Sequence, residues 1–172
     1  MKHTLIIGDL VVPTESISGF DQDYESIEAS QFDRTADGTG VIYSLNWQKL
    51  RTTISGRGWA PSGLRSLDRG QFYRMRCIAP DAVLSDANTI TIPSGRRTDT
   101  NHDPVGFASM GDQLIETPIT GIVSDVATLT TVSGADGYMV WYWPDITVAI
   151  LRNTCRMTPG PSSQWTIEAE QQ

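Results

Sequence analysis

The histidines are the first residues whose types and spacing could do chemistry. His102 lies close to Asp99 and Asp103, a combination found in metal sites and acid–base clusters. A metal site needs three or more converging ligands that regular elements hold in place. The segment around His102 has no predicted strand or helix that could hold them. His3, the only other histidine, is at the extreme start of the chain, and no Gly-x-Ser-x-Gly elbow accompanies it. We therefore expect His102 to lie in a solvated loop.

A second candidate is a group of four acids at nearly alternating positions. They are Asp21, Asp23, Glu25 and Glu28. Glycoside hydrolysis uses two carboxyl groups held at a set separation in a cleft. Alternating acids more often form the solvated face of a strand, so a wall-degrading hydrolase is the least favoured function.

The glycines and cysteines do not add a cofactor site. The segments 56–58 (Gly-Arg-Gly) and 94–96 (Ser-Gly-Arg) lack the Gly-Lys-Ser/Thr continuation that cradles a nucleotide phosphate. Cys77 and Cys155 form no Cys-x-x-Cys pair, and we expect both to be buried or half-buried apolar side chains. The sequence thus predicts a non-enzymatic protein without a cofactor or metal.

Four aromatic residues near position 140 could form a stacking platform for sugars or single strands. They are Tyr138, Trp141, Tyr142 and Trp143. Their side chains alternate between the two faces of one predicted strand, so a buried sheet contact is favoured over an exposed platform.

The elements that would position these residues follow from composition and length. With 172 residues, 39% of them hydrophobic and 19% charged, the chain is expected to form a single soluble β domain, residues 1–172, and not a disordered, collagenous or coiled-coil protein. Its longest apolar run, 138–143, is far shorter than the about 20 residues of a membrane helix. The Met-Lys-His start lacks a secretory apolar segment, so we expect assembly in the cytosol.

Short β-rich runs separated by turn residues predict an antiparallel β-sandwich or barrel. The predicted strands are Thr4–Ile7, Leu10–Val12, Val41–Leu45, Arg51–Ser55, Gln71–Ala79, Asn88–Ile92, Val105–Ser109, Gln113–Thr117, Ile122–Val132, Tyr138–Trp143, Ile146–Leu151 and Gln164–Ala169. In the predicted strand Gln71–Ala79, Met75 and Cys77 share one face while Arg74 and Arg76 share the other. One short helix is expected over 61–69, and polar residues 94–104 predict an exposed loop or arm.

The net charge of −7 conceals three blocks of opposite sign. Residues 9–37 sum to −7, residues 47–80 to +6 and residues 81–172 to −7, and Lys2 completes the total. Such blocks could form two patches that meet across neighbouring copies, or they could pair inside one fold. Specific binding to duplex DNA is not expected of so acidic a chain.

One sequence pattern covers residues 30–80 and the final predicted strand. It comprises Trp47–Pro61, Asp37-Gly38 upstream, Leu67-Asp68, Cys77–Pro80 and the closing segment Trp165–Glu170. This pattern resembles small tail proteins of long-tailed bacteriophages. The resemblance is to the tail-tip or baseplate region, near the distal tail protein. It implies a tail-tube-like β-barrel or sandwich, located in the virion tail and assembled in the host cytoplasm. It also implies a homo-oligomeric ring, sixfold in this family, that contacts tail tube and baseplate proteins while DNA passes without specific binding.

A ring built by unlike surfaces suggests which residues form the interface. The expected acidic patch is Asp21, Asp23, Glu25 and Glu28, and the expected basic patch is Arg57, Arg65, Arg74 and Arg76. Three further residues, Arg96, Arg97 and His102, are expected to make loop contacts. A structural corner is expected at Gly56, Gly58, Trp59 and Pro61. Two alternatives stay open: a tail terminator or completion protein, and a β-sandwich carbohydrate-binding module that contacts the host surface.

Overall fold

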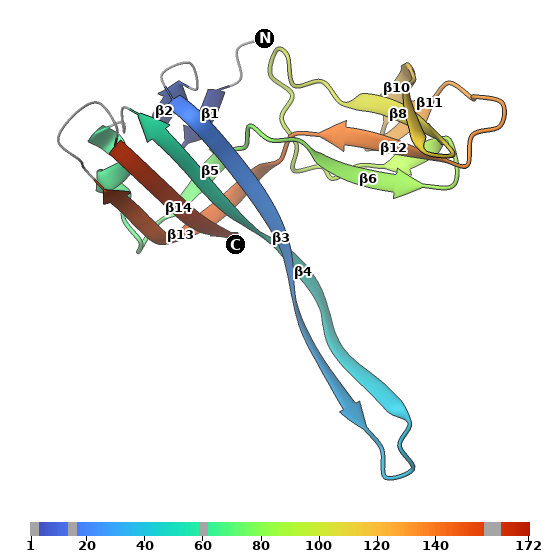
Figure 1. Cartoon of the computed structure of the whole chain (residues 1–172), viewed down its shortest axis with the longest axis horizontal. Helices are drawn as coiled ribbons and strands as arrows, with labels where there is room; N and C mark the ends of the chain where they lie inside the picture. Colours follow the sequence, from blue (N-terminus) through green and yellow to red (C-terminus); the bar gives the residue numbers. More distant parts are fainter. Residues whose placement is uncertain (1–3, 14–16, 59–61, 157–162) are drawn as a thin grey trace. The chain divides into compact units, whose positions relative to one another are not determined.

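The chain is built almost entirely of antiparallel β-strands, which confirms the predicted mainly β class (Figure 1). It is described from a computed structural model, which defines residues 4–13, 17–58, 62–156 and 163–172. Among these residues the sheets are open and sandwich-like and do not close into a barrel. They group into two compact units: Met1–Glu15 with Arg74–Ile146 form unit 1, and Ser16–Tyr73 with Thr147–Gln172 form unit 2. The single domain expected from length stays a prediction.

Unit 1 contains most of the short strands. They are β1 (Thr4–Ile7), β2 (Leu10–Pro13), the end of β5 (Phe72–Arg76), β6 (Asp81–Ser85), β7 (Thr89–Thr91), β8 (Val105–Met110), β9 (Gln113–Glu116), β10 (Ile119–Val123), β11 (Val126–Leu129) and β12 (Gly137–Tyr142). Strands β6, β12, β8 and β9 form one sheet in that order, and β10, β11 and β7 form another. Strand β1 pairs with both β2 and β5.

The core of unit 1 comes from alternating side chains on these strands. Strand β12 buries every second residue, including Tyr138 and Val140. They cluster with Ile90 and Leu129 from the three-stranded sheet and Ala108 from β8. Burial of this apolar surface between facing sheets is the main favourable contribution to the stability of a sandwich.

Unit 2 is a sheet with the strand order β13–β14–β4–β3. Its strands are β3 (Ile17–Arg34), β4 (Gly40–Gly58), β13 (Asp145–Arg156) and β14 (Ser163–Gln171). Ile54, Trp165 and Ile167 are at most 2% exposed and form its apolar face. The short 3-10 helix η2 (Ser62–Ser66) buries Leu64, whose carbonyl accepts a hydrogen bond from the Asn153 amide.

Several strand boundaries differ from the sequence predictions. The two runs predicted within 41–55 belong to the single strand β4, and the run predicted at 122–132 is the hairpin of β10 and β11. That hairpin turns at Ser124 and Asp125, which adopt positive φ values of 48° and 66°. Strands β3 and β6 were not predicted, and the expected helix over 61–69 is only the 3-10 turn. The predicted faces of β5 are confirmed, because Met75 and Cys77 are fully buried.

The glycine corner is located differently from the prediction. Gly56 lies inside β4, paired with Trp165, so the strand does not turn there. Gly58 ends the strand with φ 120°, a conformation that favours glycine. Trp59 and Pro61, the other two residues of the predicted corner, lie outside the described residues.

The packing of unit 1 can be tested at Gly106 in β8. A Cβ atom there would lie 2.7 Å from both the Thr117 carbonyl oxygen and a Leu129 methyl carbon. Because neither neighbour can move without disturbing the core, we expect Gly106→Ala to lower the free energy of unfolding by about 1–3 kcal/mol. Urea unfolding provides the measurement. Gly121→Ala in β10, where a new Cβ meets nothing within 4 Å, is the control; equal midpoints for both variants would contradict the packing described.

Candidate interaction arm

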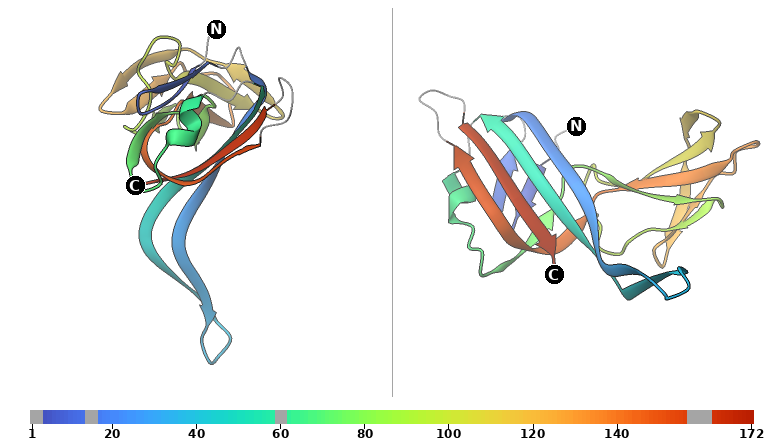
Figure 2. Two further views of the ribbon diagram at one scale, coloured as in Figure 1. Left: turned by 90° about the vertical axis from the view of Figure 1, so that its left-hand side faces the viewer. Right: turned by 60° about the horizontal axis from the view of Figure 1, so that its bottom comes forward.

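The distal part of the β3–β4 hairpin is a two-stranded ribbon, which we call the arm and define as residues 28–48 (Figure 1). Strand β14 pairs with β4 only from Arg51 to Gly58. Among the described strands, the arm therefore has no third strand beside it. Figure 2 shows the ribbon curving as it leaves the other strands of its sheet.

Local sequence explains both the turn and the bend of the arm. At the tip, the Asp37 carboxylate accepts hydrogen bonds from the Thr35 hydroxyl and the Thr39 N–H, and Gly38 adopts φ 87°. These hydrogen bonds lower the pKa of Asp37 below its usual value, and the bond from the Thr35 hydroxyl has the largest effect. Farther down, β4 places residues 45–47 opposite Ala29 alone. Such a bulge bends the ribbon and increases its twist.

The arm carries large apolar side chains that are exposed on both faces. They are Phe32 (61% exposed), Ile42 (70%), Tyr43 (61%), Leu45 (71%) and Trp47 (42%). Phe32 lies directly opposite Ile42, so these two share one face. Tyr43 and the alternate residue Leu45 lie on the other face. Neither face of the arm is therefore the polar side of an ordinary amphipathic hairpin.

This arrangement is characteristic of a segment that is buried on assembly. A lone two-stranded hairpin is marginally stable in water. Clustered exposed apolar side chains mark interaction surfaces. In addition, no described strand pairs with the outer edge of either strand of the arm, and such an edge can pair with another strand.

The acidic and basic charge blocks lie next to each other in unit 2. Glu25 faces Arg51 across the hairpin, with a nitrogen–oxygen distance of 3.4 Å, and Arg51 also binds Glu170 at 2.9 Å. The hydrogen bond to Glu170 is the main cause of the raised pKa of Arg51. The sequence left open whether the charge blocks pair inside one fold or between copies. Glu25 pairs inside the fold, with Arg51.

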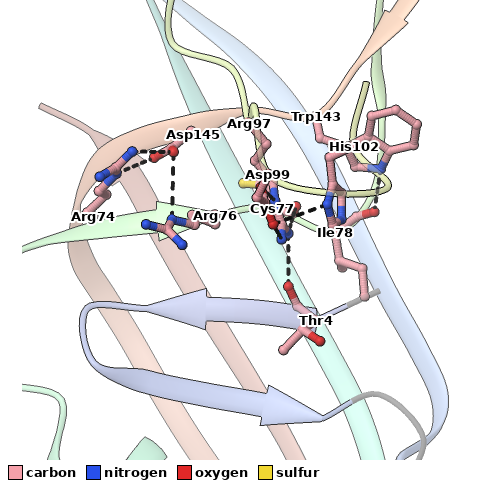
Figure 3. A network of polar contacts seen from close by, with 10 residues as sticks. All are labelled: Thr4, Arg74, Arg76, Cys77, Ile78, Arg97, Asp99, His102, Trp143 and Asp145. Carbon is pink, nitrogen blue, oxygen red and sulfur yellow. Dashed lines mark hydrogen bonds and ion pairs between the residues drawn. The ribbon is translucent and has the colours of Figure 1, made fainter. Parts of the chain in front are cut away.

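Two residues of the expected basic patch are also paired inside the chain. Arg74 and Arg76 both contact Asp145, at 2.7 and 3.8 Å, and the Asp145 side chain is only 9% exposed (Figure 3). Arg57 and Asp21, from opposite patches, line one groove on the sheet of unit 2.

Five residues of the patches have no ion pair with any residue that the structure describes. They are Asp21, Asp23, Glu28, Arg57 and Arg65. The role of the two patches as an interface between copies stays a prediction.

Residues 94–104 are irregular, as predicted, but they do not form a free arm. Arg97 and His102 are each 2% exposed. The Arg97 guanidinium donates to the carbonyls of Thr4 and Cys77, at 2.9 and 2.8 Å, and forms two hydrogen bonds with Asp99 (Figure 3). Buried carbonyl groups need hydrogen-bond donors, and Arg97 supplies them to Thr4 and Cys77. These bonds fix the loop against the rest of unit 1.

The remaining loop residues add to this anchor. His102 packs edge-to-face on Trp143, with ring centroids 5.6 Å apart, and its Nδ1 lies 3.3 Å from Asp99. Arg96 binds Asp125 at 2.7 Å. Contrary to the solvated loop expected from sequence, the histidine is part of a packed polar cluster.

The four aromatic residues in and directly after β12 do not form an exposed platform. Tyr138, Tyr142 and Trp143 are 7%, 6% and 9% exposed, and Trp141 packs against Phe107 with centroids 4.6 Å apart. Burial, followed by the hydrogen bond to Asp81, raises the pKa of Tyr142. A carbohydrate-binding module would need these rings exposed, so this alternative loses the feature on which it depended.

The described residues contain no group of three or more potential metal ligands. They also include no helix with the length and hydropathy needed to cross a membrane. Comparisons with protein-family models, curated proteins and solved structures found no match. The arm is therefore interpreted from its own geometry. Sequence reasoning missed it, although apolar residues on both faces of the run 41–47 were a visible signal.

The Arg97–Asp99 contact predicts a pH dependence. The guanidinium lowers the pKa of Asp99 to about 2, against about 3.9 in an unfolded chain. The contact therefore stabilises the fold fully above about pH 5, and this contribution is lost as the pH falls toward 2. We expect Asp99→Asn to be less stable than the parent at neutral pH and to approach it below about pH 3. Thermal unfolding across pH tests this. Asp103→Asn, an exposed acid of the same loop, is the control; parallel curves for Asp99→Asn and the parent would contradict the assignment.

Proposed function

We propose that this protein is a non-enzymatic structural subunit that assembles with copies of itself through the arm. The observation that carries the proposal is the two-faced apolar ribbon, which is exposed in the single chain. Because these side chains are exposed in the single chain, assembly breaks none of their packing contacts and buries their apolar surface.

The size of the apolar surface supports a stable contact. The exposed parts of its five large side chains amount to roughly 600 Å², taking aromatic side chains at about 150–250 Å² each. A standard protein interface buries about 800 Å² on each partner. The arm alone therefore approaches the area that a specific interface requires.

A second copy is a suitable partner because the same chain offers apolar strand edges. Leu84 on β6 is 75% exposed, and Leu114 and Ile115 on β9 are 54% and 42% exposed. Both strands are edges of the four-stranded sheet of unit 1. An arm and a strand edge are unlike surfaces, and contacts between unlike surfaces generate rings when the rotation closes.

The location of the assembly is proposed from the resemblance to phage tail proteins. It favours a distal tail or baseplate ring around the DNA channel, in contact with tail tube and baseplate proteins. A tail terminator or completion protein would use the same type of ring. The acidic charge of the chain is compatible with a lumen through which DNA passes without binding.

The arm contact is tested with the double variant Tyr43→Ser/Leu45→Ser. Both side chains are exposed in the single chain, so we expect the fold to be retained while the dissociation constant of the oligomer rises at least about tenfold. Sedimentation velocity over a range of concentrations gives the mass, and circular dichroism checks the fold. Val123→Ser removes an apolar side chain with 75% exposure outside the arm and should leave assembly unchanged.

Two results would overturn the proposal. One is a parent protein that stays monomeric at high concentration together with its native neighbours. The other is a double variant that assembles as well as Val123→Ser. Electron micrographs of the assembled protein should show closed rings; open filaments would contradict the ring geometry.

A further inference from the structure

A small polar cavity lies beside η2 in unit 2. Its volume is about 320 Å³, and it is lined by Arg65, Leu67, Arg69, Asn153 and Cys155. The first three residues come from η2 and the segment after it, and the last two share the face of β13 that turns toward η2. The Asn153 amide fixes this arrangement by its hydrogen bond to the Leu64 carbonyl.

The two arginines of this cavity differ from most others in the chain. Six arginines have an acidic partner: Arg51, Arg74, Arg76, Arg96, Arg97 and Arg152. Arg65 and Arg69 make no ion pair with any residue that the structure describes. The nearest acid in sequence, Asp68, accepts a hydrogen bond from the Gly70 N–H at 2.8 Å. Segments 59–61 and 157–162, which flank these elements in sequence, contain no acid.

Among the described residues, no acid compensates the positive charges of Arg65 and Arg69. Two guanidinium groups at one cavity repel each other, and the repulsion is relieved when an anion lies between them. Each guanidinium presents a planar fork of donors that matches the oxygen pairs of phosphates and carboxylates. We propose that this cavity binds an oxyanion of the phosphate or carboxylate class, held by Arg65 and Arg69.

Cys155 provides a direct measurement of occupancy. It is half-buried and lines the cavity, whereas Cys77, the other cysteine, is fully buried. Alkylation by iodoacetamide, a neutral reagent, should therefore report mainly on Cys155, with peptide mass spectrometry identifying the site. At constant ionic strength and neutral pH, replacing chloride by inorganic phosphate should slow this alkylation several-fold, because a bound anion blocks access to the thiol.

The variants distinguish this site from general screening of charge. Arg65→Gln/Arg69→Gln should abolish the protection by phosphate, measured as the ratio of alkylation rates in chloride and phosphate. Arg57→Gln removes an exposed arginine outside the cavity and should leave the ratio unchanged. The proposal is overturned if alkylation of the parent protein depends neither on phosphate nor, in chloride, on protein concentration, or if the double variant is protected as well as the parent.

The two sources of the oxyanion are separated by protein concentration. If a carboxylate of a second copy fills the cavity, protection appears in chloride alone, increases with protein concentration and is lost in the double variant. If a free ion fills it, protection follows phosphate at every protein concentration. Either result supports the site, and neither depends on assembly through the arm, so the two proposals fail independently.

Discussion

A ribbon of two strands has two faces and no interior, so it cannot bury apolar side chains by itself. This constraint governs the arm. In the rest of unit 2, one face of the sheet buries Ile54, Trp165 and Ile167 and the other carries polar residues. Beyond Glu28 this division ends, because Phe32 and Ile42 occupy one face while Tyr43 and Leu45 occupy the other. The hydrogen bonds of the hairpin hold the ribbon together, but the burial that normally stabilises a sheet is missing.

The charged residues of unit 2 secure the base of the arm. Arg51 lies between Glu25 on β3 and Glu170 on β14, at the last position where β4 has strands on both sides. Because partly exposed ion pairs contribute little net stability, their effect here is on register and geometry. An acidic β3 beside a basic β4 favours this pairing over a slipped one. The opposite charge blocks thus have a role inside the fold, whatever further contacts they make between copies.

The sequence predicted those parts of the fold in which side chains alternate cleanly. Strand β12 and the two faces of β5 follow from the period of two. The alternating acids of β3 indicated a solvated strand face, but the strand was not placed because polar residues such as Gln22 and Ser26 stand between them instead of an apolar series. The long β4 was divided because the bulge at residues 45–47 shifts its pattern. Arg97 was expected to make contacts from an exposed loop, since no sequence pattern reveals that the carbonyls of Thr4 and Cys77 accept its hydrogen bonds.

The two-faced character of the arm also limits what can receive it. A hairpin lying flat on a surface would cover Phe32 and Ile42 or Tyr43 and Leu45, but not both pairs. Full burial needs contacts on both faces, as when a ribbon enters a cleft or adds to a strand edge with another surface above it. A closed ring of identical subunits meets this requirement, because each subunit has a neighbour on either side and the junction between neighbours presents two surfaces. The geometry of the arm therefore favours an assembly of several copies over a simple pair.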